Sequence, residues 1–265
     1  MTRFIHFSDA HEPAAPGWDS LFDKRLIGSL NALLMRGRRY DPARTERMIG
    51  YILRERPDGV IFTGDAVSTS EPEEFARAAR RFKPLTESGI PVIAVPGNHD
   101  CYVRDARCRA AMEDFYTSLN GEPFRREPHV RIIGDVRFAV IHCALPTPWI
   151  LSSGVMTPET ASFLTAQADS ADERPLVCVG HFPLLGEKGV AAWRRGLRGA
   201  DSAAELLRRG TISLSLCGHV HRGGLRPCGD SAGELCAGSV SKYGVFAEIL
   251  YNGGHTFEIR RRTLD

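Results

Sequence analysis

Acidic, amide and imidazole side chains gather in five short motifs whose composition suits metal binding. In chain order these are Asp9-Ala10-His11, Gly64-Asp65, Gly97-Asn98-His99-Asp100, Gly180-His181 and Gly218-His219-Val220-His221. Carboxylates and neutral imidazoles are suitable ligands for Mn, Fe, Zn or Mg, and the motifs contain no thiolate. Besides His99 they offer seven candidate ligands, which is too many for one four-coordinate ion. The motifs therefore indicate two divalent ions that share a bridging carboxylate.

Spacing within the motifs gives a second argument. In Asp-x-His and His-x-His, alternate residues of a locally extended chain point the same way, which can place two donors near one metal or two adjacent metals. A glycine directly before a ligand permits a tight turn and a close backbone approach. Each motif alone has an ordinary explanation as a turn, a helix cap or a satisfied core histidine. Their joint appearance favours a metal site over these separate explanations.

Each motif follows an apolar run of strand length by at most a couple of residues. We expect strands at 3–7, 60–63, 92–95, 130–133, 136–142, 176–179, 212–216, 234–237, 245–250 and 256–261. Helical patterns separate most of them, at 22–36, 42–56, 71–87, 106–119, 158–168 and 201–209. This alternation predicts an α/β fold, in which the carboxyl ends of strands meet at one ligand-binding edge. The last three strands lack intervening helices, which favours antiparallel pairing there.

Composition limits the fold and the partners. With 265 residues and 43% hydrophobic content, the chain can form one α/β domain across 1–265. Its 34 basic and 32 acidic side chains give a net charge of +2, too balanced for generic nucleic-acid binding, so no nucleic acid is expected as a partner.

The cysteines and the chain start bear on location. Seven cysteines without a CxxC pair do not form a disulfide framework, and Cys143, Cys178 and Cys217 are predicted to be small core residues. The N-terminus lacks the apolar stretch of a signal peptide, and no apolar run approaches the length of a membrane span. We therefore expect a cytoplasmic location.

The five motifs in this order resemble the signature of the calcineurin-like metallophosphoesterase superfamily, which is D-x-H, G-D-x-x-[DN], G-N-H-[DE], G-H and G-H-x-H. The resemblance covers most of the chain, from Asp9 to His221. It implies a four-layer αββα sandwich with mixed sheets and a two-metal centre at the sheet ends.

The resemblance also implies a role for each motif residue. One metal would be held by Asp9, His11, Asp65 and His221. The other would be held by Asp65, Asn98, His181 and His219, so that Asp65 bridges the two ions. His99 would be a catalytic residue that faces the scissile phosphate and stabilises charge or protonates the leaving oxygen.

One position departs from the family pattern. The superfamily often has Asp or Asn three residues after the bridging aspartate, where it helps to orient the catalytic histidine. This chain has Ser68 there, which offers a weaker, uncharged side-chain partner. The departure concerns the orientation and acid strength of His99 and leaves the expected metal ligands untouched.

The predicted function is hydrolysis of a phosphodiester or pyrophosphate bond, by attack of a hydroxide that bridges two divalent ions. Mn²⁺ is the expected ion, with Fe, Zn or Mg as alternatives. A non-catalytic metal-binding scaffold is a weaker alternative, because loss of catalysis in this fold usually removes ligands and all seven are present. A nuclease would need an extended basic groove with exposed aromatic residues, and the near-neutral charge of the chain gives no positive support for one.

The substrate depends on segments outside the motifs, above all the basic amphipathic insertion at 21–39. Its sequence, LFDKRLIGSLNALLMRGRR, has apolar residues at helical spacing with basic flanks. It could lie on an anionic membrane as a peripheral contact on the inner face, or it could pack on the core. The segment is similar to the KRLxGxLN-type insertion of bacterial phosphoesterases that include the UDP-2,3-diacylglucosamine pyrophosphatase of lipid A synthesis. A lipid-linked nucleotide diphosphate and a cyclic nucleotide are therefore the leading substrate types.

Four further residues are candidates for substrate binding. Arg104 and Arg107 follow Gly-Asn-His-Asp and could hold a second phosphate by paired hydrogen bonds, and Arg222 follows His221. Each arginine could equally be a solvated surface residue. His142 ends a predicted strand and could line the same cleft.

Overall fold

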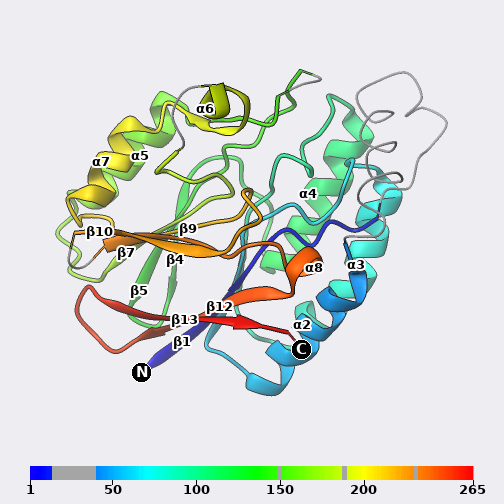
Figure 1. The fold of residues 1–265 in the computed structure, drawn as a ribbon, viewed down its shortest axis with the longest axis horizontal. Helices are drawn as coiled ribbons and strands as arrows, with labels where there is room; N and C mark the ends of the chain where they lie inside the picture. The colour runs from blue at the N-terminus through cyan, green and yellow to red at the C-terminus, as the bar shows by residue number, and fades with distance from the viewer. Residues whose placement is uncertain (14–39, 149–150, 187–189, 230–231, 265) are drawn as a thin grey trace.

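Two mixed β-sheets lie face to face and helices cover their outer faces in the computed structural model, which describes residues 1–13, 40–148, 151–186, 190–229 and 232–264 (Figure 1). The first sheet has the order β13-β12-β1-β2-β3. Its strands are β1 (Thr2–Phe7), β2 (Gly59–Phe62), β3 (Val92–Ala94), β12 (Val245–Tyr251) and β13 (Phe257–Thr263). In this sheet β1, β2 and β3 are parallel, while β12 and β13 are each antiparallel to their neighbours.

The second sheet has the order β10-β11-β9-β7-β5-β4. Its strands are β4 (His129–Ile133), β5 (Val136–Val140), β7 (Leu176–Val179), β9 (Leu214–Cys217), β10 (Gly224–Cys228) and β11 (Ala232–Cys236). The four central strands β5, β7, β9 and β11 run parallel, and the two edge strands are antiparallel to their neighbours. A separate parallel pair joins β6 (Gly154–Val155) to β8 (Leu197–Arg198).

Three helices cover the first sheet and two cover the second. The first group is α2 (Pro42–Glu55), α3 (Pro72–Thr86) and α4 (Ala106–Asn120), and the second is α5 (Pro158–Ala168) and α7 (Asp201–Arg208). Two shorter helices are α6 (Val190–Arg195) and α8 (Val240–Tyr243). Helices of the two groups lie on opposite sides of the paired sheets in Figure 1, so the predicted αββα sandwich is confirmed.

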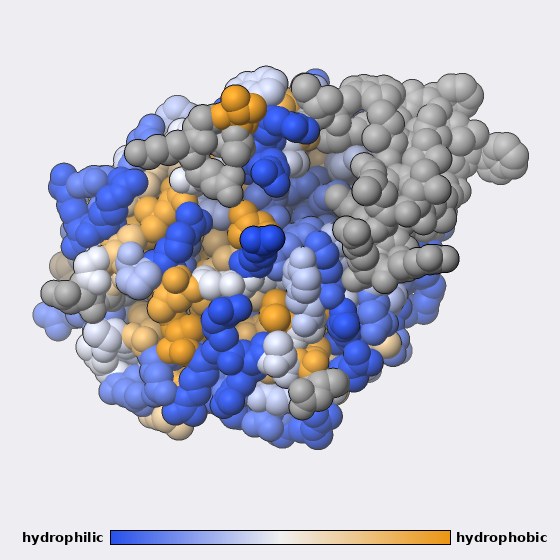
Figure 2. Space-filling model, viewed as in Figure 1, coloured by the Kyte–Doolittle hydropathy of each residue, from blue (hydrophilic) through white to orange (hydrophobic). Residues whose placement is uncertain are grey.

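The two-residue period of the strands explains the layers. Along β1, Phe4 faces the core between the sheets, whereas Ile5 and Phe7 face the helices. Along β7, Val177 faces the inter-sheet core and Cys178 faces the opposite helices. Because both faces of each central strand are buried, these strands appear in the sequence as continuous runs of apolar residues. Hydrophobic residues on the face shown in Figure 2 stand in small groups among hydrophilic ones.

Most of the expected elements form close to their predicted bounds, for local reasons visible in the sequence. The Asp41 side chain accepts a hydrogen bond from the Ala43 amide and caps α2, which begins at Pro42. The hairpin between β4 and β5 turns at Gly134, which has φ of 57°. Cys143, Cys178 and Cys217 are buried as predicted.

Strand pairing in the last third of the chain differs in part from the prediction. Strands β12 and β13 form the expected antiparallel pair, but β11 runs parallel to β9 in the other sheet. The reason is the four-residue helix α8, which lies between β11 and β12 where the chain passes from one sheet to the other. The strand β10 was not predicted.

The expected helix at 22–36 and the insertion at 21–39 lie outside the described residues. Within the part of the chain that is described, no helix has both the length and the apolar character needed to cross a membrane.

The packing of the two sheets can be tested at Phe138. Its ring on β5 meets that of Phe4 on β1 edge-on, with centroids 5.2 Å apart, and both residues are buried. We expect Phe138→Ala to lower the free energy of unfolding by about 3–5 kcal/mol in urea denaturation, because it opens a cavity between the sheets. The control Leu225→Ala, at a side chain that is 43% exposed, should change it by less than about 0.5 kcal/mol. Equal effects of the two substitutions would contradict this packing.

Candidate metal centre

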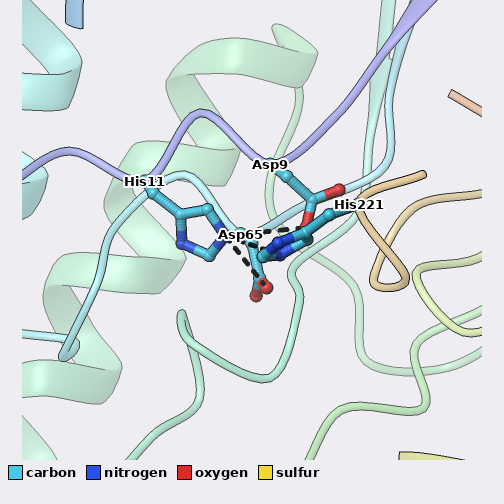
Figure 3. A group of neighbouring side chains, drawn as sticks. All are labelled: Asp9, His11, Asp65 and His221. Atoms are coloured by element: carbon cyan, nitrogen blue, oxygen red, sulfur yellow. Dashed lines mark hydrogen bonds and ion pairs between the residues drawn. The ribbon is translucent and has the colours of Figure 1, made fainter. Parts of the chain in front are cut away.

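Four of the predicted ligands, Asp9, His11, Asp65 and His221, form one tight group (Figure 3). One ligand atom from each lies within 4.8 Å of all the others. His221 Nε2 is 3.2 Å from Asp9 Oδ1 and 3.1 Å from His11 Nε2. His11 Nε2 is 3.6 Å from Asp9 Oδ1 and 3.9 Å from Asp65 Oδ2. Only His221 in this group is appreciably exposed, so three donors converge in an interior site.

A second group of donors continues from Asp65. His181 Nε2 lies 3.4 Å from Asp65 Oδ2 and 3.1 Å from Asn98 Oδ1. His219 Nδ1 lies 2.8 Å from the same Asn98 oxygen. The single oxygen Asp65 Oδ2 therefore stands between His11 of the first group and His181 of the second. All seven predicted ligands are brought together, from loops that follow parallel strands of both sheets.

Hydrogen bonds with main-chain groups determine which side-chain atoms of the histidines and of Asp65 face the centre of the site. His181 Nδ1 donates to the Thr63 carbonyl at 2.6 Å, and His219 Nε2 donates to the Arg195 carbonyl at 2.9 Å. A carbonyl can only accept, so the opposite ring nitrogen of each histidine can present a lone pair to the site. The His99 amide donates to Asp65 Oδ1 at 2.8 Å, which leaves Oδ2 for the shared position.

The loops reach this arrangement through left-handed backbone, not through extended backbone. Seven non-glycine residues of the described chain have positive φ, and five of them are predicted ligands, namely Asp9, His11, Asp65, His219 and His221. The expectation that Asp-x-His and His-x-His converge by local extension is therefore wrong. Such conformations cost on the order of 1–3 kcal/mol each and persist where surrounding contacts impose them. Here the amides of Asp9 and His11 donate to the carbonyls of Gly64 and Asp65 and tie two of the loops together.

Glycines beside the ligands leave space for close contacts, as predicted. A Cβ on Gly97 would overlap the Asp65 carboxylate and lie 2.6 Å from the Asp65 amide nitrogen. A Cβ on Gly218 would lie 2.7 Å from Asp9 Oδ2. At both positions any side chain would displace a carboxylate of the site.

The electrostatics of the group favour a bound cation. Burial alone would raise the pKa of Asp9, but the facing His221 and His11 imidazoles outweigh it and place the pKa below its usual value. Burial of Asp65 is likewise outweighed by His181 and His99, so its pKa is lowered. Asp9 Oδ1 is buried and has no hydrogen-bond partner among the described residues. Buried ionised carboxylates need a compensating charge, and this donor set fits divalent cations.

Comparison with known proteins agrees with this geometry. The family model of the calcineurin-like phosphoesterases matches residues 2–223. The chain belongs to this family. A solved structure of a dimetal phosphatase from Danio rerio shares the fold, with a TM-score of 0.67 and 14% identity over 99% of this chain and 98% of that one.

Curated relatives of this family member include two phosphodiesterases. The glycerophosphodiester phosphodiesterase GpdQ of Enterobacter lignolyticus is 30% identical over 142 residues, which is 50% of this chain and 44% of the relative. A cAMP/cGMP dual specificity phosphodiesterase of Mycobacterium tuberculosis is 24% identical over 225 residues, which is 82% of this chain and 61% of the relative. The match thus covers less than two thirds of either relative.

His99 of this phosphoesterase is half-buried and lies against the first group of ligands. Its ring centroid is 4.9 Å from that of His11, and the ring stacks on Tyr102 at 5.5 Å. His99 Nδ1 donates to the main-chain carbonyl of Ser68 at 2.7 Å, while the Ser68 hydroxyl donates to the Glu12 carbonyl. The expectation that the side chain at this position would be the partner of His99 is thus wrong, because the backbone carbonyl takes that role.

Asp100 is a contributor to the site that sequence reasoning missed, although it stands in the third motif. Its buried carboxylate accepts hydrogen bonds from the amides of Asp65, Val67 and Gly97 and from the Tyr116 hydroxyl, at 2.7–3.1 Å. Burial and the neighbouring Asp65 raise the pKa of Asp100 to about 7, against the lowering effect of these donors. Asp100 thereby joins the loop that carries Asp65 to the loop that carries Asn98.

The four weaker candidates are dispersed. Arg104 and His142 line a cavity of about 670 Å³, whereas Arg107 and Arg222 do not. The Arg107 side chain lies 3.5 Å from Asp105, the residue that caps α4, and Arg222 is exposed. The expected substrate contact of these two arginines stays a prediction.

The space around the Asp65 carboxylate can be tested by Gly97→Ala. Because the added methyl group displaces this carboxylate, we expect the metal content after loading with Mn²⁺ to fall at least about tenfold, as measured by mass spectrometry. Gly50→Ala in α2 is a matched control, since its Cβ would meet only the Arg54 side chain at 3.6 Å. Full metal content in Gly97→Ala protein would show that the site tolerates the displacement and would contradict the geometry described above.

Proposed function

We propose that this protein is a hydrolase of phosphoric diesters or diphosphates that uses two divalent metal ions. The observation that carries this proposal is the position of Asp65 Oδ2, which lies between His11 Nε2 at 3.9 Å and His181 Nε2 at 3.4 Å. An oxygen shared by two groups of nitrogen and oxygen donors suits a pair of ions better than a single one. Membership of the calcineurin-like phosphoesterase family supports the same conclusion.

Each ion would have four protein ligands. Asp9, His11, Asp65 and His221 would hold the first, and Asp65, Asn98, His181 and His219 would hold the second. Mn²⁺ is the proposed ion, with Fe, Zn and Mg as alternatives. When bound, two such ions supply Lewis-acid chemistry, which lowers the pKa of water and neutralises phosphoryl oxygens in an in-line displacement.

The protein's own catalytic group would be His99. Its Nδ1 proton is held by the Ser68 carbonyl, which fixes the ring plane and turns the opposite nitrogen away from that carbonyl. From this position Nε2 would donate to a phosphoryl oxygen or pass a proton to the leaving oxygen. The hydrogen bond from Nδ1 to the main-chain carbonyl of Ser68 thus orients the ring.

A diester or diphosphate is favoured over a monoester by the names of two of the curated relatives, which are phosphodiesterases. The cyclic-nucleotide enzyme is matched across most of this chain and makes a cyclic nucleotide a substrate to test. The lipid-linked nucleotide diphosphate, the peripheral membrane contact and the cytoplasmic location rest on the sequence alone, chiefly on 21–39, and stay predictions.

Substitutions can separate metal binding from catalysis. We expect Asp65→Asn and His219→Ala to lose metal and activity together, because each removes a ligand. His99→Ala should keep its metal while kcat falls by about 100-fold or more, as for loss of a general acid. Metal content by mass spectrometry and turnover of bis(p-nitrophenyl) phosphate measure both, with the exposed His255→Ala as control. A His99→Ala protein without metal would falsify the role given to this residue.

A substrate panel tests the reaction class. Protein loaded with Mn, Fe, Zn or Mg is assayed on bis(p-nitrophenyl) phosphate, p-nitrophenyl phosphate, cyclic nucleotides and UDP-2,3-diacylglucosamine. We expect the Mn-loaded enzyme to cleave the diesters faster than the monoester, and His219→Ala protein prepared in parallel measures contaminating activity. Hydrolysis of the monoester alone would overturn the proposal of a diester or diphosphate substrate.

A further inference from the structure

A cavity of about 670 Å³ lies between the start of α4, with the segment before it, and the chain that follows β5. Its volume is in the range of small-molecule sites, about 300–1,000 Å³. Apolar side chains such as Val103, Met112 and Leu145 form part of its wall. The cavity can therefore accommodate an organic group and not only water.

This cavity adjoins the candidate metal centre. Asp100 and Cys101, which directly follow His99, both line it. The Asp100 carboxylate is in turn hydrogen-bonded to the Asp65 amide at 2.8 Å. One residue of the cavity wall thus contacts the loop that carries the proposed bridging ligand. A substrate with its phosphorus at the metal centre could extend a substituent into this space.

Basic side chains outnumber acidic ones in the cavity wall, by four to two. Four arginines line the cavity, namely Arg104, Arg109, Arg126 and Arg198. Arg126 pairs with Glu113 at 2.9 Å, but the other three have no carboxylate within ion-pair distance in the described part of the chain. The two acidic residues of the wall are already engaged: Asp100 accepts four hydrogen bonds, and Asp105 caps α4 through the amides of Arg107 and Cys108.

His142 adds a polar group to the same wall. It is half-buried against Phe124, and its Nδ1 is buried without a hydrogen-bond partner among the described residues. Burial and the neighbouring Arg126 lower the pKa of His142 to about 4, so the ring is neutral near pH 7. Protein atoms enclose this nitrogen, so His142 contributes a neutral ring to the wall and leaves charge recognition to the arginines.

We propose that the cavity binds a second anionic group, a phosphate or a carboxylate, carried on an organic substituent of the phosphoester substrate. This inference rests on the proposed function, because it places the scissile phosphate at the metal centre. The guanidinium groups would bind the anion by paired hydrogen bonds, and the apolar wall would contact the organic part. The preferred substrate would then carry a second negative charge beyond the phosphorus that reacts.

A matched pair of chromogenic diesters tests the proposal. Thymidine 5′-(p-nitrophenyl phosphate) is compared with the same compound carrying a 3′-phosphate, and with a 3′-succinyl ester that distinguishes a carboxylate from a phosphate. We expect kcat/KM to be on the order of tenfold higher for at least one of the anionic compounds, as charged hydrogen bonds imply. In the double variant Arg104→Gln, Arg198→Gln this preference should fall towards one. Arg80→Gln, at an exposed arginine of α3 outside the cavity wall, should keep it.

A binding measurement makes the test independent of turnover. Calorimetric titration of metal-free protein with thymidine 3′,5′-bisphosphate and thymidine 5′-monophosphate should show tighter binding of the bisphosphate, and the double variant should lose the difference. If the metal-loaded protein cleaves all three diesters equally, or if the double variant keeps the wild-type preference, the cavity proposal is wrong while the proposed function stands. If no diester is cleaved, the proposed function fails, and calorimetry alone decides whether the cavity binds the anion.

Discussion

The position of the Asp65 carboxylate is the constraint on which both halves of the site depend. One oxygen is held by the His99 amide, and the other lies between His11 and His181. The Asp65 amide is bound by the buried Asp100 carboxylate, and Gly97 gives the Asp65 side chain its space. A small shift of this carboxylate would change the distances to both groups of donors at once. The His99 amide, the Asp100 carboxylate and Gly97 therefore all act to hold the Asp65 side chain in one position.

The two sheets supply the next level of support. Asp65 follows β2 of the first sheet, whereas His181 follows β7 and His219 follows β9 of the second. The distances between these ligands are therefore set by how the sheets pack, through the apolar layer that includes Phe4 and Phe138.

Left-handed turns at five of the seven predicted ligands oppose folding, and an extensive core is needed to maintain them. Two buried carboxylates add to this cost when no cation is present. Metal binding should in turn stabilise the fold, because it favours the native arrangement of these loops.

The sequence predicted the fold class and most elements because strand and helix patterns, caps and hairpin turns are local signals. Strand β10 was missed because Gly223, Gly224 and Pro227 interrupt its pattern, and such residues are tolerated at an edge strand. The backbone of the Asp-x-His and His-x-His motifs was predicted wrongly, since left-handed turns at non-glycine residues are imposed by tertiary contacts. Asp and His are enriched in such turns, but this preference is too weak to locate a turn from sequence. The role of the Ser68 carbonyl was hidden for a similar reason, because every residue has a carbonyl and only the fold aims this one at His99.

Metal binding and substrate choice therefore differ in how far sequence can predict them. The proposed ligands are of few types, follow strands and come in short motifs, so their chemistry and their location support each other. The cavity wall is made of residues from α4, from the chain after β5 and from β8, which no sequence pattern connects.

Arginine on an exposed surface is most often solvated, and only the shared cavity distinguishes Arg198 from the many arginines elsewhere on the chain. Arg107 and Arg104 illustrate this, because two arginines three residues apart on the chain differ in whether they line the cavity. Under the proposed function, selectivity would depend on which exposed side chains the fold gathers beside the candidate metal centre, because its ligands alone would not distinguish one phosphoester from another.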